Sequence, residues 1–151
     1  MYSSLLPIHS IVRWLLLLMM LISLYVAYNG VRHKLAFTPL ANKIRHWTAT
    51  IAHVQLMLGM VLYFYSPVVQ HPMPPSDTAL MSQHAFFKYL HLVLMMSAIV
   101  VLTIGSEKAK RTSLAFDQYK TILIWYTAAL ILILVAIPWP FSPFVSRPLF
   151  R

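Results

Sequence analysis

The chain has 151 residues, of which 60% are hydrophobic and only 10% are charged, with a mean hydropathy of +0.71. A soluble globular domain averages about 25% charged residues, so this composition excludes that class and indicates an integral membrane protein. The formal net charge of +9 is spread over Lys and Arg between apolar blocks. Because neither a motif nor a basic domain accompanies it, this charge does not indicate nucleic-acid binding.

Four apolar blocks follow one another, each about as long as the ~20 residues that cross a bilayer. Each should form a helix, because lipid-exposed backbone must satisfy its own hydrogen bonds and a barrel would show alternating strands. The first block is too long for a removable signal peptide and lacks a small-residue cleavage site. The sequence predicts an all-α, up-down-up-down four-helix bundle, one membrane domain over residues 1–151, with helices at about 5–28, 47–65, 86–104 and 121–137.

Lys and Arg concentrate in two of the three connections. The basic residues of the first and third connections are Arg32, Lys34, Lys43, Arg45, Lys108, Lys110, Arg111 and Lys120. Both connections should therefore face the cytoplasm. The Pro-rich second connection, from Gln70 to Asp77, contains no Lys or Arg. We expect it to lie on the outer side together with both termini, including the C-terminal tail with Arg147 and Arg151.

Few residue types remain for chemistry inside the bilayer. The chain has no cysteine, which excludes disulfides, thiolate-held iron-sulfur clusters and covalent c-type haem. Its carboxylates, Asp77, Glu107 and Asp117, all fall in predicted connections. Proton transfer through buried acids is therefore poorly supported, and His and Arg are the candidates.

The seven histidines separate by position. Three fall in connections, where we expect solvated side chains: His33, His46 and His71. The other four lie within or at the edge of predicted helices: His9, His53, His84 and His91. An ionisable group in hydrocarbon is costly, so a histidine at this depth indicates a functional site.

Helical spacing shows which side chains share a face with each histidine, because residues three, four or seven apart stack along one side. The predicted neighbours are Arg13 for His9, Met57 and Met60 for His53, and Met95, Lys88 and His84 for His91. A flat, dianionic macrocycle requires imidazole for its iron, soft apolar walls for its ring and a cation near its propionates. The residue set predicts haem b.

Depth along each helix indicates which histidines can pair. At about 1.5 Å per residue, His9 and His91 both lie roughly 6 to 10 Å below the outer surface, whereas His53 lies roughly 18 Å from the outer end of its helix. The first and third helices of such a bundle are diagonal partners. His9 and His91 are therefore the predicted axial ligands of the haem iron.

Four other residues complete the predicted cofactor site. Arg13 is expected near a propionate or a quinone head group, and Met57 and Met95 against the ring. His53 is the alternative axial ligand. If it does not bind iron, we expect it to line a quinone pocket with Gln55 or Tyr126 nearby.

Five stretches of this chain together resemble a family of small four-helix membrane proteins of Bacteroidota-type bacteria, labelled cytochrome b or left uncharacterised. They are LPIHSIVRW (6–14), AHVQLMLGMVLYF (52–64), KYLHLVLMM (88–96), VLTIGSEKAK (101–110) and IPWPF (137–141). The resemblance spans nearly the whole chain. It implies haem binding or electron transfer in the inner membrane, and its motif positions here are His9, Arg13, His53 and His91.

The sequence thus predicts a multi-pass protein of the bacterial inner membrane that binds one b-type haem and passes single electrons, with quinone and redox-complex subunits as candidate partners. With no evident substrate pocket, we expect a redox subunit rather than a complete enzyme. Two alternatives remain open. The histidines of a cofactor-free structural or assembly subunit would only join helices, and a copper-handling protein would combine them with methionine thioethers.

Overall fold

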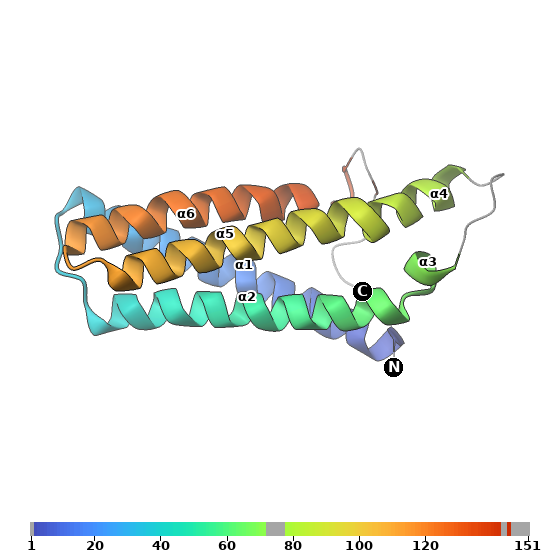
Figure 1. Ribbon diagram of the computed structural model, residues 1–151, viewed down its shortest axis with the longest axis horizontal. Helices are drawn as coiled ribbons and strands as arrows, with labels where there is room; N and C mark the ends of the chain where they lie inside the picture. The colour runs from blue at the N-terminus through green and yellow to red at the C-terminus, as the bar shows by residue number, and fades with distance from the viewer. Residues whose placement is uncertain (1, 72–77, 143–144, 146–151) are drawn as a thin grey trace.

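The computed structural model describes residues 2–71, 78–142 and 145 (Figure 1). The regular structure in these ranges is helical: α1 (Tyr2–Arg32), α2 (Pro39–Tyr65), α3 (Pro67–Gln70), α4 (Thr78–Ala85), the π-helix η1 (Phe86–Leu90), α5 (His91–Arg111) and α6 (Ala115–Ala136). Four spans are long and apolar enough to cross a membrane: α1, α2, the continuous segment from Ser82 to Arg111, and α6. The predicted all-α four-helix membrane bundle is confirmed.

The four long helices form an antiparallel bundle in which each packs against two neighbours. Helix α1 contacts α2 and α6, and α5 contacts the same two helices from the other side. Helices α1 and α5 are therefore diagonal partners, as the up-down-up-down order predicts. The start of α1 and the end of α6 lie at the same end of the bundle (Figure 1). We call this the terminal end, and the end with the α1–α2 and α5–α6 connections the basic end.

The helices extend beyond the predicted apolar spans at the basic end. They end or begin at Arg32, Pro39, Arg111 and Ala115, where the apolar spans end or begin at about 28, 47, 104 and 121. Arg45 and Glu107, placed in connections by hydropathy, therefore lie within α2 and α5. Hydropathy detects the part of a helix that suits lipid, whereas Lys, Arg, Glu and Ala continue the helix into the polar region because they are good helix formers.

Local signals at the helix ends explain where the chain turns. Helix α2 begins with Thr38, whose side chain accepts a hydrogen bond from the Ala41 N–H, followed by Pro39 in the first turn. Most of the Pro-rich connection, residues 72–77, lies outside the described residues, as do Arg147 and Arg151.

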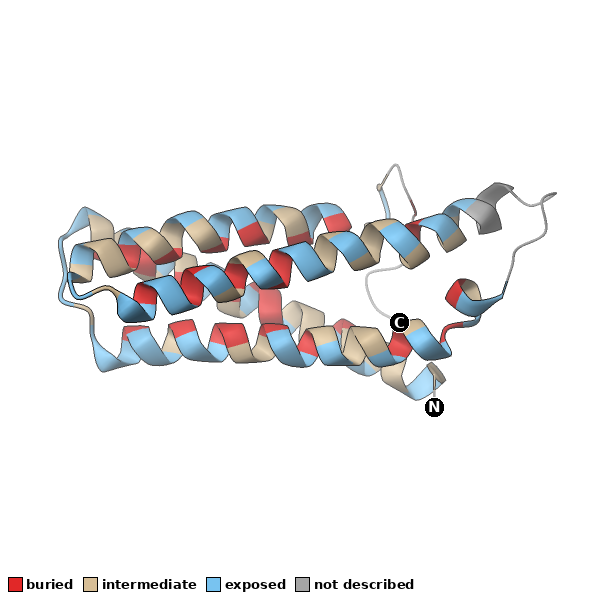
Figure 2. Ribbon diagram, viewed as in Figure 1, coloured by how far each residue is buried: buried red, intermediate tan, exposed pale blue. Residues whose placement is uncertain are grey.

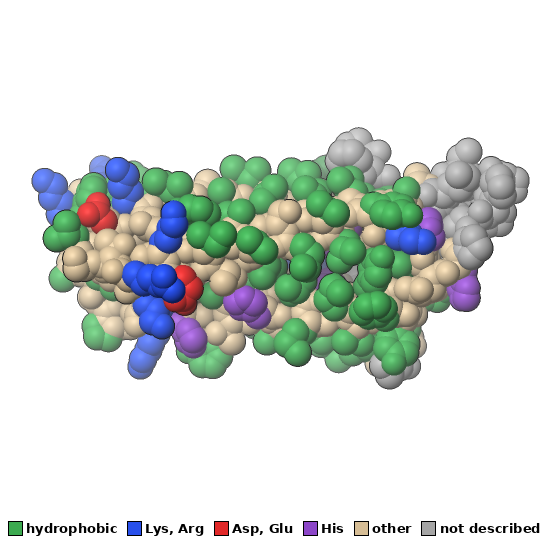
Figure 3. All heavy atoms as spheres, in the orientation of Figure 1, with side chains coloured by type: hydrophobic (Ala, Val, Ile, Leu, Met, Phe, Trp, Pro, Cys, Tyr) green, Lys and Arg blue, Asp and Glu red, His purple; other side chains and the backbone are tan. Residues whose placement is uncertain are grey.

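Small residues allow the helices to pack closely. Ala52, Ala98 and Ala129 are each 0% exposed. Buried and exposed residues alternate along the helices (Figure 2), and many of the exposed residues are large and apolar. A Cβ added to Gly105 would overlap the Trp125 side chain, so this glycine lets α6 approach α5. The bundle thus presents apolar surface outward to lipid. On the face shown in Figure 3, most of the Lys and Arg side chains gather at the basic end.

A polar cluster joins α2 to α5 near the basic end. Arg45 is 4% exposed and donates from Nη1 to the backbone and side-chain oxygens of Ser106, and from Nε and Nη2 to the side-chain oxygen of Asn42. The hydroxyl of Tyr126 donates to the Arg45 carbonyl at 2.9 Å. These bonds hold three helices together at the basic end.

Candidate functional site

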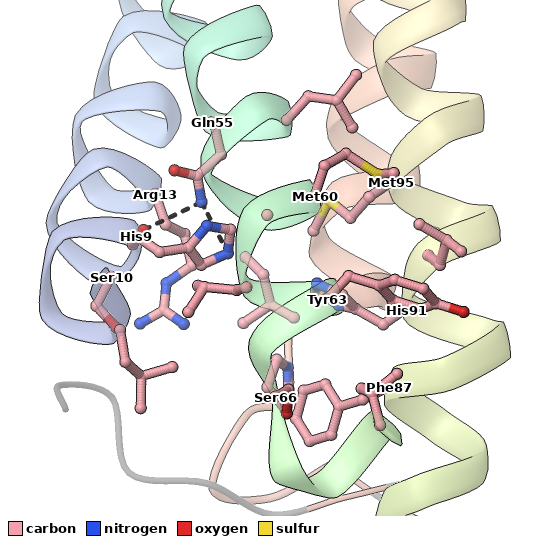
Figure 4. A pocket seen from close by; sticks show the side chains of 18 of the residues that line it. His9, Ser10, Arg13, Gln55, Met60, Tyr63, Ser66, Phe87, His91 and Met95 are labelled. Atoms are coloured by element: carbon pink, nitrogen blue, oxygen red, sulfur yellow. Dashed lines mark hydrogen bonds between the residues drawn. The ribbon is translucent and has the colours of Figure 1, made fainter. Parts of the chain in front are cut away.

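Helices α2 and α5 diverge toward the terminal end, as Figure 1 shows. A cavity of about 170 Å³ lies among the helices at this end. One water needs about 10–15 Å³, so this volume is enough for an organic ligand or a group of waters. The wall is mostly apolar, with a few polar side chains that include His9, Arg13, Gln55 and His91 (Figure 4).

His9 extends from α1 toward α2 and meets Gln55 there. The Gln55 Nε2 lies 3.2 Å from His9 Nε2 and donates to the His9 backbone carbonyl at 3.1 Å. Because an amide nitrogen can only donate, His9 Nε2 is the acceptor and the ring proton is on Nδ1. His9 Nδ1 and Gln55 Oε1 are buried without a hydrogen-bond partner among the described residues. An unsatisfied pair of this kind indicates a place where a bound group completes the bonding.

Gly59 on α2 makes room for the His9 ring. A Cβ at this position would lie 3.3 Å from His9 Cε1 and 3.9 Å from His9 Nδ1, with no other atom within 4 Å. A contact of 3.3 Å is tighter than almost all real Cβ contacts, so a larger residue would press on the imidazole. Both glycine and histidine line the cavity.

His91 enters the cavity from α5, directly after the π-helix Phe86–Leu90. Its Nδ1 lies 2.8 Å from the Ala136 carbonyl at the end of α6. A carbonyl only accepts, so Nδ1 carries the proton and Nε2 is left with a free lone pair. A histidine that donates from Nδ1 to a backbone carbonyl has the tautomer and orientation of a metal ligand bound through Nε2.

The two prolines after α6 explain why that carbonyl is available. In a continuing helix, the carbonyls of Leu134 and Ala136 would accept from the N–H groups four residues later, at positions 138 and 140. Both positions are proline, which has no N–H. The Leu134 carbonyl instead accepts from the Trp139 indole at 2.8 Å, and the Ala136 carbonyl accepts from His91. The two prolines of the IPWPF stretch therefore leave the Ala136 carbonyl available to accept the hydrogen bond that orients His91.

The other predicted site residues separate into two groups. Arg13 and Met95 line the cavity together with His9 and His91, and so does Met60. Figure 4 shows His9 and Arg13 on one side of the space and Met60, Met95 and His91 on the other. The structure thus brings together the predicted site residues of α1 and α5 around one cavity.

His53 and Met57 do not line this cavity. Both are exposed on the outer surface, with 69% of Met57 accessible, and His53 Nε2 lies 3.1 Å from the Thr103 hydroxyl. Gln55 faces inward in their place and donates a hydrogen bond from α2 to the His9 carbonyl on α1. Tyr126 is buried in the Arg45 cluster, away from the cavity.

Sequence reasoning missed three features of the site. The contact between Gly59 and His9, the π-helix before His91 and the Ala136 carbonyl each depend on tertiary packing. The carbonyl did leave a signal, because prolines at 138 and 140 mark two acceptors that must find other donors. A π-helix inside an α-helical segment frequently accompanies a functional site.

Within the described part of the chain, no three His, Cys, Asp or Glu side chains gather closely enough to hold a metal ion by themselves. A haem iron needs only two protein ligands, because the macrocycle supplies the other four. Comparison with protein-family models, curated proteins and solved structures finds no match for this chain.

Proposed function

We propose that this protein binds one b-type haem between α1 and α5 and passes single electrons within a bacterial inner membrane. The observation that supports this proposal is a pair of imidazoles, His9 and His91, from diagonal helices that line one apolar cavity. His91 is already oriented by a backbone carbonyl, with Nε2 free. Two histidines in a bundle core are a recurrent way to hold a haem.

The residues around the pair fit a haem. Met60, Met95 and Phe87 provide polarizable and aromatic surface for the faces of a flat ring. Arg13 is the cationic side chain of the cavity wall and would compensate the charge of a propionate. For His9 Nε2 to bind iron, the Gln55 amide must rotate away from the imidazole. The same rotation would allow Gln55 Oε1, which has no hydrogen-bond partner among the described residues, to accept from a donor.

When bound, the haem would supply reversible one-electron chemistry, and the chain's own residues would tune its reduction potential. The Nδ1–H bond to the Ala136 carbonyl would make His91 a stronger electron donor to the iron, which favours the ferric state. The apolar wall would exclude water and act in the opposite direction, because it favours the ferrous state, which has the lower positive charge. Because the cavity wall is mostly apolar, a membrane quinone or the subunit of a redox complex is the natural electron partner.

A second candidate, a copper(I) site, rests on the same cavity. Met60 and Met95 line it with His9 and His91, and thioether with imidazole suits that ion. In a purely structural subunit, the same histidines would act only through their bonds to Gln55 and Ala136. The experiment below separates the three functions.

The test is a dithionite-reduced minus air-oxidised spectrum of the detergent-purified protein, with pyridine haemochrome and copper analysis of the same sample. We expect a sharp reduced α-band and about one haem per chain. His9→Ala and His91→Ala should each lose the haem. The matched control is His53→Ala, an exposed histidine outside the cavity, which should keep it.

A colourless protein from haem-replete cells would refute haem binding. Copper in that protein, lost in Met60→Leu and Met95→Leu, would instead establish the metal-handling function. If neither cofactor is present and both histidine variants merely lower the melting temperature, the histidines join helices and the protein is a structural subunit.

A further inference from the structure

A second polar site lies on the outer surface of the bundle, at the seam where α2 and α5 meet. His53 lies within the predicted apolar span of α2, roughly 9 Å from the basic-end limit of that span at residue 47 and roughly 18 Å from its other limit at residue 65, at 1.5 Å per residue. It is exposed, and its surroundings on the two helices are exposed apolar side chains, among them Val54 at 44%, Met96 at 41% and Val100 at 52%. In a membrane this imidazole faces hydrocarbon, where it cannot reach water.

The tautomer of His53 follows from its one hydrogen bond. Its Nε2 lies 3.1 Å from the Thr103 hydroxyl, and that hydroxyl donates its own proton to the Ile99 carbonyl at 2.7 Å. Thr103 must therefore accept, so His53 donates from Nε2–H. Its Nδ1 is left as a bare acceptor, and within the described residues no donor reaches it. Because lipid chains offer no donor either, this acceptor needs a ligand that brings one.

The seam leads directly to the cavity. Leu56, one turn beyond His53 on α2, and Ile99, one turn beyond Thr103 on α5, both line the cavity wall. A molecule held at His53 is therefore separated from the cavity by about one helical turn. It can reach this position laterally from the bilayer, because the surface around His53 is apolar and exposed.

We propose that the α2–α5 seam binds a lipid-soluble quinol, whose hydroxyl donates to His53 Nδ1. The ligand must dissolve in hydrocarbon and present an O–H at the depth of His53, and a quinol with an apolar tail does both. The oxidised quinone has only carbonyl acceptors, so the seam discriminates between the two redox forms. This assignment rests on the proposed function only for its biological role, since a quinol held at His53 would lie about one helical turn from the cavity in which we propose the haem.

The test uses a photoreactive quinone analogue in liposomes that contain the purified protein, added either as quinol under anaerobic reducing conditions or as quinone. Labelled peptides are identified by mass spectrometry. We expect the quinol to label α2 and α5 around His53 and Thr103, up to about tenfold more than the quinone, the factor that a hydrogen bond of about 1.4 kcal/mol provides. His53→Phe should remove this preference.

Two controls keep the result interpretable. His46→Phe alters another exposed α2 histidine, near the basic end, and should label like the wild type. Thr103→Val keeps the side-chain volume but removes the acceptor that fixes the tautomer, and should lower the quinol preference.

Equal labelling by quinol and quinone, or equal labelling of His53→Phe and wild type, would overturn the assignment. So would a change of oligomeric state in His53→Phe without a change in labelling, because His53 would then contact another chain. The haem spectrum of each sample is recorded separately. A colourless protein that still shows the His53-dependent quinol preference would defeat the haem proposal and leave this one standing.

Discussion

Gly59 determines how closely the His9 imidazole can lie against α2. A helix normally prefers Ala to Gly by about 0.8–1.0 kcal/mol, so Gly at this position lowers the stability of α2. The benefit is space, since a Cβ would lie 3.3 Å from His9 Cε1. We therefore expect this residue to serve the cavity rather than the fold.

Gly59→Ala should separate fold stability from cofactor binding. The bundle should keep or slightly raise its melting temperature, because Ala favours the helix. Haem occupancy should fall on the order of tenfold, because the His9 ring is displaced. Thermal unfolding and haem content of the same preparation measure both. Wild-type haem content in Gly59→Ala and in the larger Gly59→Val would contradict this role.

The sequence did not predict which side of α2 faces the core of the bundle. His53 and Gln55 are about 200° apart around the helix, so only one of them can face the core. The histidine was the better chemical candidate, yet Gln55 faces inward and bonds to His9. Apolar residues of α2 point both toward the lipid and toward the core, because both surroundings are apolar. Amphipathic periodicity therefore carries little information about helix rotation in a membrane.

At the scale of elements, two irregular segments hold His91 in place. The π-helix Phe86–Leu90 leads into it from one side, and the end of α6 provides the Ala136 carbonyl from the other. The end of α6 was predictable from Pro138 and Pro140. The carbonyl's partner was not, because it lies 45 residues away in the sequence.

Pro140→Ala restores the backbone N–H four residues after Ala136. This N–H would compete with His91 for the carbonyl, so we expect a smaller fraction of His91 with its proton on Nδ1. Nitrogen-15 NMR of histidine-labelled protein prepared without haem reads the tautomer directly. Trp139→Phe is the control, because it removes the bond to the Leu134 carbonyl and leaves Ala136 untouched. An unchanged His91 tautomer in Pro140→Ala would show that the proline has no part in orienting the ring.

The Arg45 cluster is the counterpart of the cavity at the other end of α2. Arg45→Ala removes the hydrogen bonds to Asn42 and Ser106 and leaves Ser106 without its partner in a buried position. Bonds to a charged group contribute about 1.5–3 kcal/mol, and we expect a loss of stability of this order. The cavity lies at the opposite end, so haem content should persist in folded protein. Chemical unfolding in detergent measures the loss, and a simultaneous loss of haem would show that the two ends are coupled.

On the scale of the whole molecule, the bundle is held tightly at the basic end and is hollow at the terminal end. Composition and the four apolar blocks predicted the helical class and the number of spans, and the up-down-up-down order predicted the diagonal helices, because a bilayer permits few architectures. The shape of the cavity was not predictable, since it lies where α2 and α5 diverge, and this divergence depends on tertiary packing. That His9 of α1 and His91 of α5 line one cavity could still be predicted, because depth along a straight helix depends only on residue count.

The arrangement of charge predicts the orientation of the bundle, with the basic end in the cytoplasm and the cavity near the outer surface. The chain has no cysteine, so single substitutions can report the two sides without further changes. His71 and Ser113 are exposed residues outside the long helices, at the terminal and basic ends respectively. In intact spheroplasts, a membrane-impermeant maleimide should label His71→Cys, and it should label Ser113→Cys only after the membrane is opened. The reverse pattern would place the cavity at the cytoplasmic surface, where its electron partners would have to be sought instead.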